Sequence, residues 1–231
     1  MNDFAERVSA VAALAEPIRR DLYLFVAAQP EPISRDQGSQ GVGVARHTAK
    51  FHLDKLVEEG LLDTEFRRLS GRRGPGAGRP TKLYKRSERN LSVTLPERRY
   101  DLAGELMAQA IDNSTRDGSA AVDALHAAAA DLGAALGNQA CEQAGPRPSL
   151  ERLVAAACGG LAARGYEPRR NGDTVTLANC PFDELARGHT ELVCGMNLAL
   201  LDAVAEHLGE GKLAARLDPA SDRCCVVLAV G

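Results

Sequence analysis

Six cysteines and one run of basic side chains carry the most distinctive chemistry in this chain of 231 residues. The cysteines all follow residue 140, and they are Cys141, Cys158, Cys180, Cys194, Cys224 and Cys225. The basic run lies at 67–89, where nine Lys and Arg side chains accompany one acid, Glu88. Thiolates bind zinc and iron–sulfur clusters, whereas a concentrated basic segment attracts polyanions. The pattern therefore indicates a sulfur site in one half of the chain and an anion contact in the other.

The charge balance follows the same division. Residues 1–100 hold 18 Lys and Arg against 13 Asp and Glu, and residues 101–231 hold 10 against 18. A basic run on an acidic chain favours a local nucleic-acid contact, although a solvated loop also fits a charge run taken alone. Apolar residues make up 45% and charged residues 26%, which excludes a disordered or collagen-like chain.

The cellular compartment is predicted from two kinds of segment that the sequence does not show, a membrane span and a secretory signal. No apolar run is long enough to predict a membrane span, and the first residues lack the basic and apolar order of a secretory signal. We therefore expect a cytoplasmic protein with no membrane partner. Its cysteines should be reduced unless they hold a metal.

The basic residues lie in a predicted helix-turn-helix. Apolar spacing predicts helices over 4–15 and 17–28, a short helix over 35–40 capped by Ser34, and a helix over 45–59. The last two, joined by a glycine turn, match the helix-turn-helix order, so the last should be the recognition helix. An ordinary amphipathic helix is the alternative. The side chains expected to reach phosphates or base edges are Arg46, His47, Thr48, Lys50 and His52.

A basic hairpin is predicted to follow the recognition helix. The segments 61–69 and 82–86 have the pattern of two strands, and the loop between them is rich in glycine, proline and arginine. Such a hairpin is a wing, whose cations contact phosphates or enter a minor groove. The residues expected to make these contacts are Arg72, Arg73, Arg79 and Lys82.

One stretch resembles a known family. The segment ARHTAKFHLDKLVEEGLLDTEFRRLSGRRGPGAGRPTKLYKRS is similar to ArsR-type winged-helix transcription regulators, and FHLDKLVEEGLL and GRPTKLY are the strongest marks. Within them it most resembles the iron–sulfur regulators related to the repressor of the Suf operon. The resemblance covers most of residues 10–90. It implies a homodimeric repressor that binds double-stranded, palindromic operator DNA.

The same resemblance implies a cofactor. In that family, cysteines after an NCPF-like start, on the next helix and near the C-terminus bind an iron–sulfur cluster, which we expect to be of the 4Fe-4S type. Here Cys180, Cys194 and Cys224 match this pattern. Some relatives have a further cysteine where this chain has Val175 and Thr176. The fourth ligand therefore stays open among Cys225, His189, Asp183 and a small molecule.

Geometry limits how these cysteines can meet. If 183–208 formed one helix, Cys194 would lie about 16 Å along it and too far from Cys180. The ligand hypothesis thus requires a break, which Gly188 can supply, with Thr190 capping a second helix. Adjacent residues of a strand face opposite sides, so only one of Cys224 and Cys225 is expected to be a ligand, and we choose Cys224. Buried structural cysteines remain the alternative, and Cys158 and Cys141 are expected to be bystanders.

The whole chain is predicted to have an α+β fold in three parts. These are a winged helix-turn-helix domain at 1–92, a helical dimerisation region at 93–145, and an α/β sensor domain at 146–231 with a hairpin at Asn171-Gly172. The alanine-rich helix expected at 119–143 can serve either as a dimer interface, which we favour, or as intradomain core.

Two other functions are weighed against a cluster-sensing regulator. The first is a winged-helix regulator stabilised by zinc, since thiolates also suit that metal. The second is a small-molecule effector domain or an enzyme. The chain has no P-loop, no GxSxG and no paired catalytic His and Asp, so we expect it not to be an enzyme.

Overall fold

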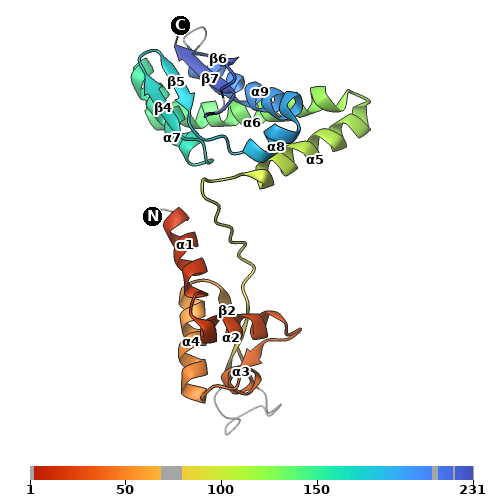
Figure 1. Ribbon diagram of the computed structural model, residues 1–231, viewed down its shortest axis with the longest axis vertical. Helices are drawn as coiled ribbons and strands as arrows, with labels where there is room; N and C mark the ends of the chain where they lie inside the picture. Colours follow the sequence, from red (N-terminus) through yellow and green to blue (C-terminus); the bar gives the residue numbers. More distant parts are fainter. Residues whose placement is uncertain (1–2, 69–79, 210–212, 221, 231) are drawn as a thin grey trace. The chain divides into compact units, whose positions relative to one another are not determined.

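The computed structural model describes residues 3–68, 80–209, 213–220 and 222–230. The chain divides into two compact units, Met1–Val93 and Thr94–Gly231 (Figure 1). The two helices of the segment 93–145, which we expected to form a region of their own, belong to the second unit. Within the described residues, no helix is both long and apolar enough to span a membrane.

In its described residues, 3–68 and 80–93, the first unit has four helices and a three-stranded antiparallel sheet. Its elements are α1 (Asp3–Ala13), α2 (Pro17–Ala27), β1 (Ile33–Ser34), α3 (Arg35–Val42), α4 (Arg46–Glu58), β2 (Leu62–Arg67) and β3 (Thr81–Arg86). The strand order is β1-β3-β2, and only the two-residue β1 was not predicted. The predicted helix-turn-helix order is therefore confirmed, with a hairpin after it.

Local signals define both ends of α3 and the turn into α4. Ser34 begins α3 with a reciprocal cap, in which its hydroxyl accepts from the Gln37 backbone and the Gln37 side chain accepts from the Ser34 backbone. Gly43 ends α3 in the left-handed region at φ 73°, which suits glycine and turns the chain into α4. Leu53 and Leu56 of α4 then pack in the core of the unit.

The part of the second unit that the structure describes packs five helices with a four-stranded sheet. Its elements are α5 (Tyr100–Asp117), α6 (Ala121–Ala144), α7 (Leu150–Ala162), β4 (Pro168–Asn171), β5 (Thr174–Leu177), α8 (Asp183–Gly188), α9 (Thr190–Leu208), β6 (Leu213–Leu217) and β7 (Val226–Val230). The strand order is β4-β5-β7-β6, and every pair is antiparallel. The expected α+β class is thus confirmed.

The long helices α6 and α9 lie side by side (Figure 1). They approach closely because α6 has glycine at the contact: a Cβ at Gly133 would lie 2.1 Å from the Leu200 carbonyl oxygen. The buried alanines of α6, including Ala129 and Ala140, belong to the core of this unit. This face of α6 therefore serves the intradomain core, the alternative we did not favour, and any dimer contact must use other surfaces.

The helical stretch 183–208 is interrupted as the sulfur hypothesis requires. Helix α8 ends at Gly188, and α9 begins at Thr190. The expected cap is wrong, because the Thr190 hydroxyl donates back to the Ala186 carbonyl at 2.7 Å. The break places Cys194 in the second turn of α9.

Candidate functional site

The outer face of α4 presents basic side chains and one unexpected aromatic ring. Arg46, His47 and Lys50 are exposed, and Thr48 is half-buried. Phe51 lies among them with 65% of its surface exposed. An exposed phenylalanine beside cations suits a groove of duplex DNA, where apolar side chains contact the methyl group of thymine. The sequence analysis missed Phe51, although its place directly after Lys50 on the polar face was a visible signal.

His52 does not belong to this face. Its side chain is 12% exposed, and its Nδ1 lies 3.4 Å from Oε2 of Glu16. Glu16 itself caps α2 by accepting from the backbone N–H groups of Ile18 and Arg19. The structure thus corrects the predicted DNA-facing set, because His52 lies between α4 and the start of α2.

Asp54 ties the recognition helix to the hairpin. Its carboxylate accepts from Lys82 Nζ at 2.6 Å, from the Tyr84 hydroxyl at 2.8 Å and from Lys50 Nζ at 2.9 Å. Burial alone would raise the pKa of Asp54, but these three hydrogen bonds lower the pKa to about 2. Lys82, expected to contact DNA, is therefore paired with Asp54 in the free protein.

The tip of the predicted wing is not part of the described structure. Arg72, Arg73 and Arg79 lie outside the described residues. Strands β2 and β3, which carry that tip, pair in register from Leu62 with Arg86 to Arg67 with Thr81. The hairpin that would present the three arginines is therefore formed, and their contacts stay a prediction.

Four cysteines of the second unit gather at one place. Cys180 lies in the segment after β5, Cys194 in α9, and Cys224 and Cys225 directly before β7. Cys224 is in hydrogen-bonded interaction with Cys180 and Cys225, and Cys225 interacts in the same way with Cys194. The three predicted ligands are thus brought together. Cys224 was preferred to Cys225 on the argument that adjacent residues of a strand face opposite sides. That argument is wrong here, because both cysteines precede β7 and strand alternation does not apply to them.

The electrostatics single out Cys224, whose side chain is 1% exposed. The thiols of Cys180 and Cys225 lower the pKa of Cys224 well below its ordinary value, against the effect of burial. The pKa values of Cys180 and Cys225 are raised, first by their hydrogen bonds to Cys224 and then by burial. Of these three thiols, Cys224 is the one that its neighbours favour in the ionised form.

A buried amide also contacts the sulfur of Cys224. Asn197 Nδ2 donates to Cys224 Sγ at 3.1 Å, and Asn197 Oδ1 accepts from the Tyr166 hydroxyl at 2.5 Å. The sequence analysis missed both residues. The available signal was an asparagine three positions after Cys194 within an apolar helix, which places the two side chains on one helix face.

Four gathered thiols are a donor set that suits both zinc and iron–sulfur clusters. Among the described residues, no three His, Cys, Asp or Glu side chains are arranged to hold one metal ion. The four thiols lie close enough to interact electrostatically, Cys180 with both Cys224 and Cys194, and Cys225 with the same two. Four cysteines are the usual ligands of a cluster, which offers several iron atoms rather than one point. Cys180, Cys194, Cys224 and Cys225 are the residues that would hold it.

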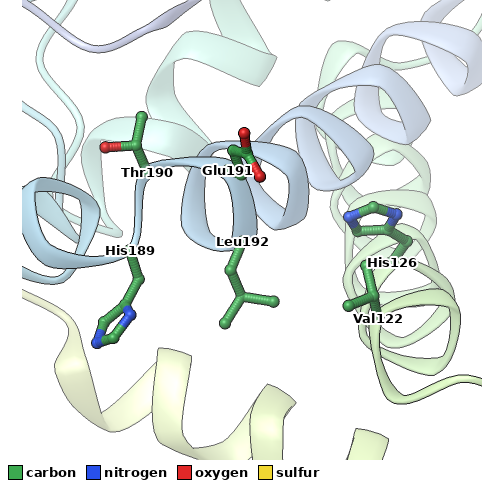
Figure 2. Close-up of a pocket in the computed structure, with 6 residues that line it drawn as sticks. All are labelled: Val122, His126, His189, Thr190, Glu191 and Leu192. Atoms are coloured by element: carbon green, nitrogen blue, oxygen red, sulfur yellow. The ribbon is translucent and has the colours of Figure 1, made fainter.

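The other candidates for a fourth ligand are directed elsewhere. Asp183 lies 2.8 Å from the guanidinium of Arg187 and 3.6 Å from that of Arg98. His189 lies at the break before α9 and lines an open pocket of about 470 Å³ (Figure 2). The side chains around this pocket do not converge on one point in Figure 2, and they are Val122, His126, His189, Thr190, Glu191 and Leu192.

The Cys180 segment is fastened to the start of the second unit. The Arg98 guanidinium donates to the Cys180 carbonyl at 3.1 Å and to the side-chain oxygen of Asn179. The Asn179 amide donates in turn to the Glu97 carbonyl at 2.9 Å. Because this unit begins at Thr94, residues adjacent to the junction with the first unit touch the segment that carries Cys180.

Comparison with known proteins identifies one part of the chain. Residues 14–65, from the end of α1 into β2, match the family model described as Helix-turn-helix domain. No curated protein and no solved structure matches the chain significantly. The match supports a DNA-binding transcription regulator, and a domain of this kind is typical of regulators rather than enzymes.

Proposed function

We propose that this chain is a transcription repressor that binds operator DNA as a homodimer and responds to an iron–sulfur cluster. Cys180, Cys194, Cys224 and Cys225 would be the cluster ligands. The gathering of four thiols from three separate segments is the observation that carries the proposal. Together with the helix-turn-helix match at residues 14–65, it supports a regulator with a sulfur-based sensor.

The DNA contact uses α4 and the hairpin. Helix α4 enters the major groove, which is wide enough for a helix, and Arg46, His47 and Lys50 reach phosphates or base edges. The arginines of the wing add contacts to the backbone, and their contribution falls as salt rises. A homodimer places two such helices on a palindromic site, one for each half-site.

The cluster site is coupled to DNA binding through the segment that carries Cys180, which is hydrogen-bonded to the start of the second unit. The bound cluster supplies a centre that is sensitive to oxidation and to iron supply. Cys180 would hold the cluster through its sulfur, and the Cys180 carbonyl accepts from the Arg98 guanidinium. A change in the position of this segment therefore acts on the residues next to the junction, and such a differential contact is what can bias DNA affinity.

A regulator stabilised by zinc is the second candidate, because four thiolates also suit that metal. The cluster is favoured because Cys180, Cys194 and Cys224 match the ligand pattern of the iron–sulfur regulators that the chain resembles. Metal analysis separates the two: iron with acid-labile sulfide supports the cluster, and zinc without sulfide supports the alternative.

Regulation is tested by DNA binding of the loaded and cluster-free forms. A duplex is first selected by the loaded full-length protein from a random pool, and its affinity is then measured for both forms under anaerobic conditions. We expect a tighter complex with the loaded form and a protein-to-duplex ratio of two to one. Equal affinities would contradict sensing, and a loaded protein that selects no duplex would contradict the DNA-binding function itself.

A further inference from the structure

Two buried polar side chains lie directly behind the cysteine cluster. Asn197 is 1% exposed, and Tyr166 is also buried. A buried amide is unfavourable unless its hydrogen-bonding groups are paired. Asn197 meets this condition at both ends, because Oδ1 accepts from Tyr166 and Nδ2 donates to Cys224 Sγ at 3.1 Å. The side-chain amide of the buried Asn197 thus donates to a sulfur atom of the cysteine cluster.

Tyr166 fixes which end of the amide faces the sulfur. Burial raises the pKa of Tyr166 well above its ordinary value, so the phenol stays protonated and can donate. A donating hydroxyl pairs with the amide oxygen, and the amide nitrogen is then directed toward Cys224. Tyr166 also packs edge-on against Phe182, at 6.3 Å between ring centroids, which holds its ring in place.

We propose that Asn197, oriented by Tyr166, is a positioning residue that donates to the Cys224 ligand sulfur and favours the reduced form of the bound cluster. The inference rests on the proposed cluster. A hydrogen bond to a ligand sulfur withdraws electron density from it, and such bonds are among the features that set cluster reduction potentials. The helix supports this role, because Asn197 follows the ligand Cys194 by three residues on α9.

The test is an anaerobic redox titration of the reconstituted full-length protein, followed by the visible absorbance of the cluster. The variants are Asn197→Leu, which removes the amide, and Tyr166→Phe, which removes only the hydroxyl. Each should lower the ratio of reduced to oxidised cluster at a fixed applied potential by about threefold to tenfold, which is the effect of one hydrogen bond. The double variant should lower this ratio no further than Asn197→Leu alone, because Tyr166 acts through Asn197.

Met196→Leu is the matched control, since Met196 is a buried apolar residue directly before Asn197 on α9. It should leave the ratio unchanged. If Asn197→Leu does not fold, Tyr166→Phe decides the matter alone. An unchanged ratio in a folded variant that holds a full cluster overturns this inference and leaves the proposed function intact. A wild-type protein without iron and sulfide overturns both.

Discussion

Replacing Asp54 with asparagine should loosen the attachment of α4 to the hairpin. The substitution keeps the size of the side chain but removes the charge that accepts from Lys82 at 2.6 Å and from Lys50 at 2.9 Å. It also weakens the acceptor for the Tyr84 hydroxyl. The free energy of unfolding of the first unit should therefore fall at neutral pH.

The size of the effect follows from the pKa of Asp54, which is lowered from 3.8 to about 2. That difference corresponds to at most about 2.5 kcal/mol of stability at pH 7. Because the side chain is 27% exposed, solvent screening reduces the expected loss to about 1 kcal/mol.

The pH dependence has a definite sign. The pKa is lower in the folded state than in the unfolded state, so the contribution is present above pH 4 and disappears as the pH falls toward 2. The difference between wild type and Asp54→Asn should fall by about half between pH 6 and pH 3.

Urea unfolding with pulsed hydrogen exchange of peptides from α4 and β3 measures this difference. The control is Asp63→Asn, on the exposed side of β2, which should change the midpoint little at either pH. A loss for Asp54→Asn that is the same at pH 6 and pH 3, or no loss at all, would refute the reasoning.

Three further predictions concern packing, readout and capping. Gly133→Ala should lower the stability of the second unit by about 1–3 kcal/mol through overpacking against Leu200. The control Gly104→Ala, on α5 with open space around it, should raise the stability by up to about 1 kcal/mol. Equal shifts of the two melting temperatures, measured by circular dichroism, would contradict the close contact between α6 and α9. Phe51→Ala should weaken binding to the selected duplex about tenfold and to a random duplex much less, and equal losses in a gel-shift titration would exclude base readout. Ser34→Ala should destabilise the first unit by about 1 kcal/mol, and an unchanged urea midpoint would show that the cap is dispensable.

The first unit could be predicted from the sequence because its signals are local. Pro17 at the start of α2, the Ser34–Gln37 cap and Gly43 each define a helix end through the backbone of neighbouring residues. The inward turn of His52 could not be predicted in this way, since it depends on Glu16 from a different helix. Strand β1 has two residues, too few to show any period.

The second unit shows where sequence patterns stop being informative. The Asn171-Gly172 turn and the break at Gly188 were both predicted, because glycine defines each of them locally. The alanines of α6 predicted a close helix contact but could not tell whether the partner helix lies in the same chain, and the structure shows α9 there.

The cysteine site was predicted in part. The resemblance supplied Cys180, Cys194 and Cys224, whereas Cys225 was only one of several candidates for the fourth ligand and ranked below Cys224 on a rule that holds only within strands. Its position beside Cys224 depends on where β7 begins, at Val226. The long-range pairing of Tyr166 with Asn197 has no local signature at all.

The central claim is that the four gathered thiols hold an iron–sulfur cluster, and iron and acid-labile sulfide analysis after anaerobic reconstitution tests it most directly. Wild type should take up iron and sulfide in equal amounts, close to four of each per chain for a 4Fe-4S cluster. Cys180→Ser should lose most of both, while Cys158→Ser, at a half-buried cysteine on α7, should retain them. Wild type without sulfide, or full loading of Cys180→Ser, would contradict the account.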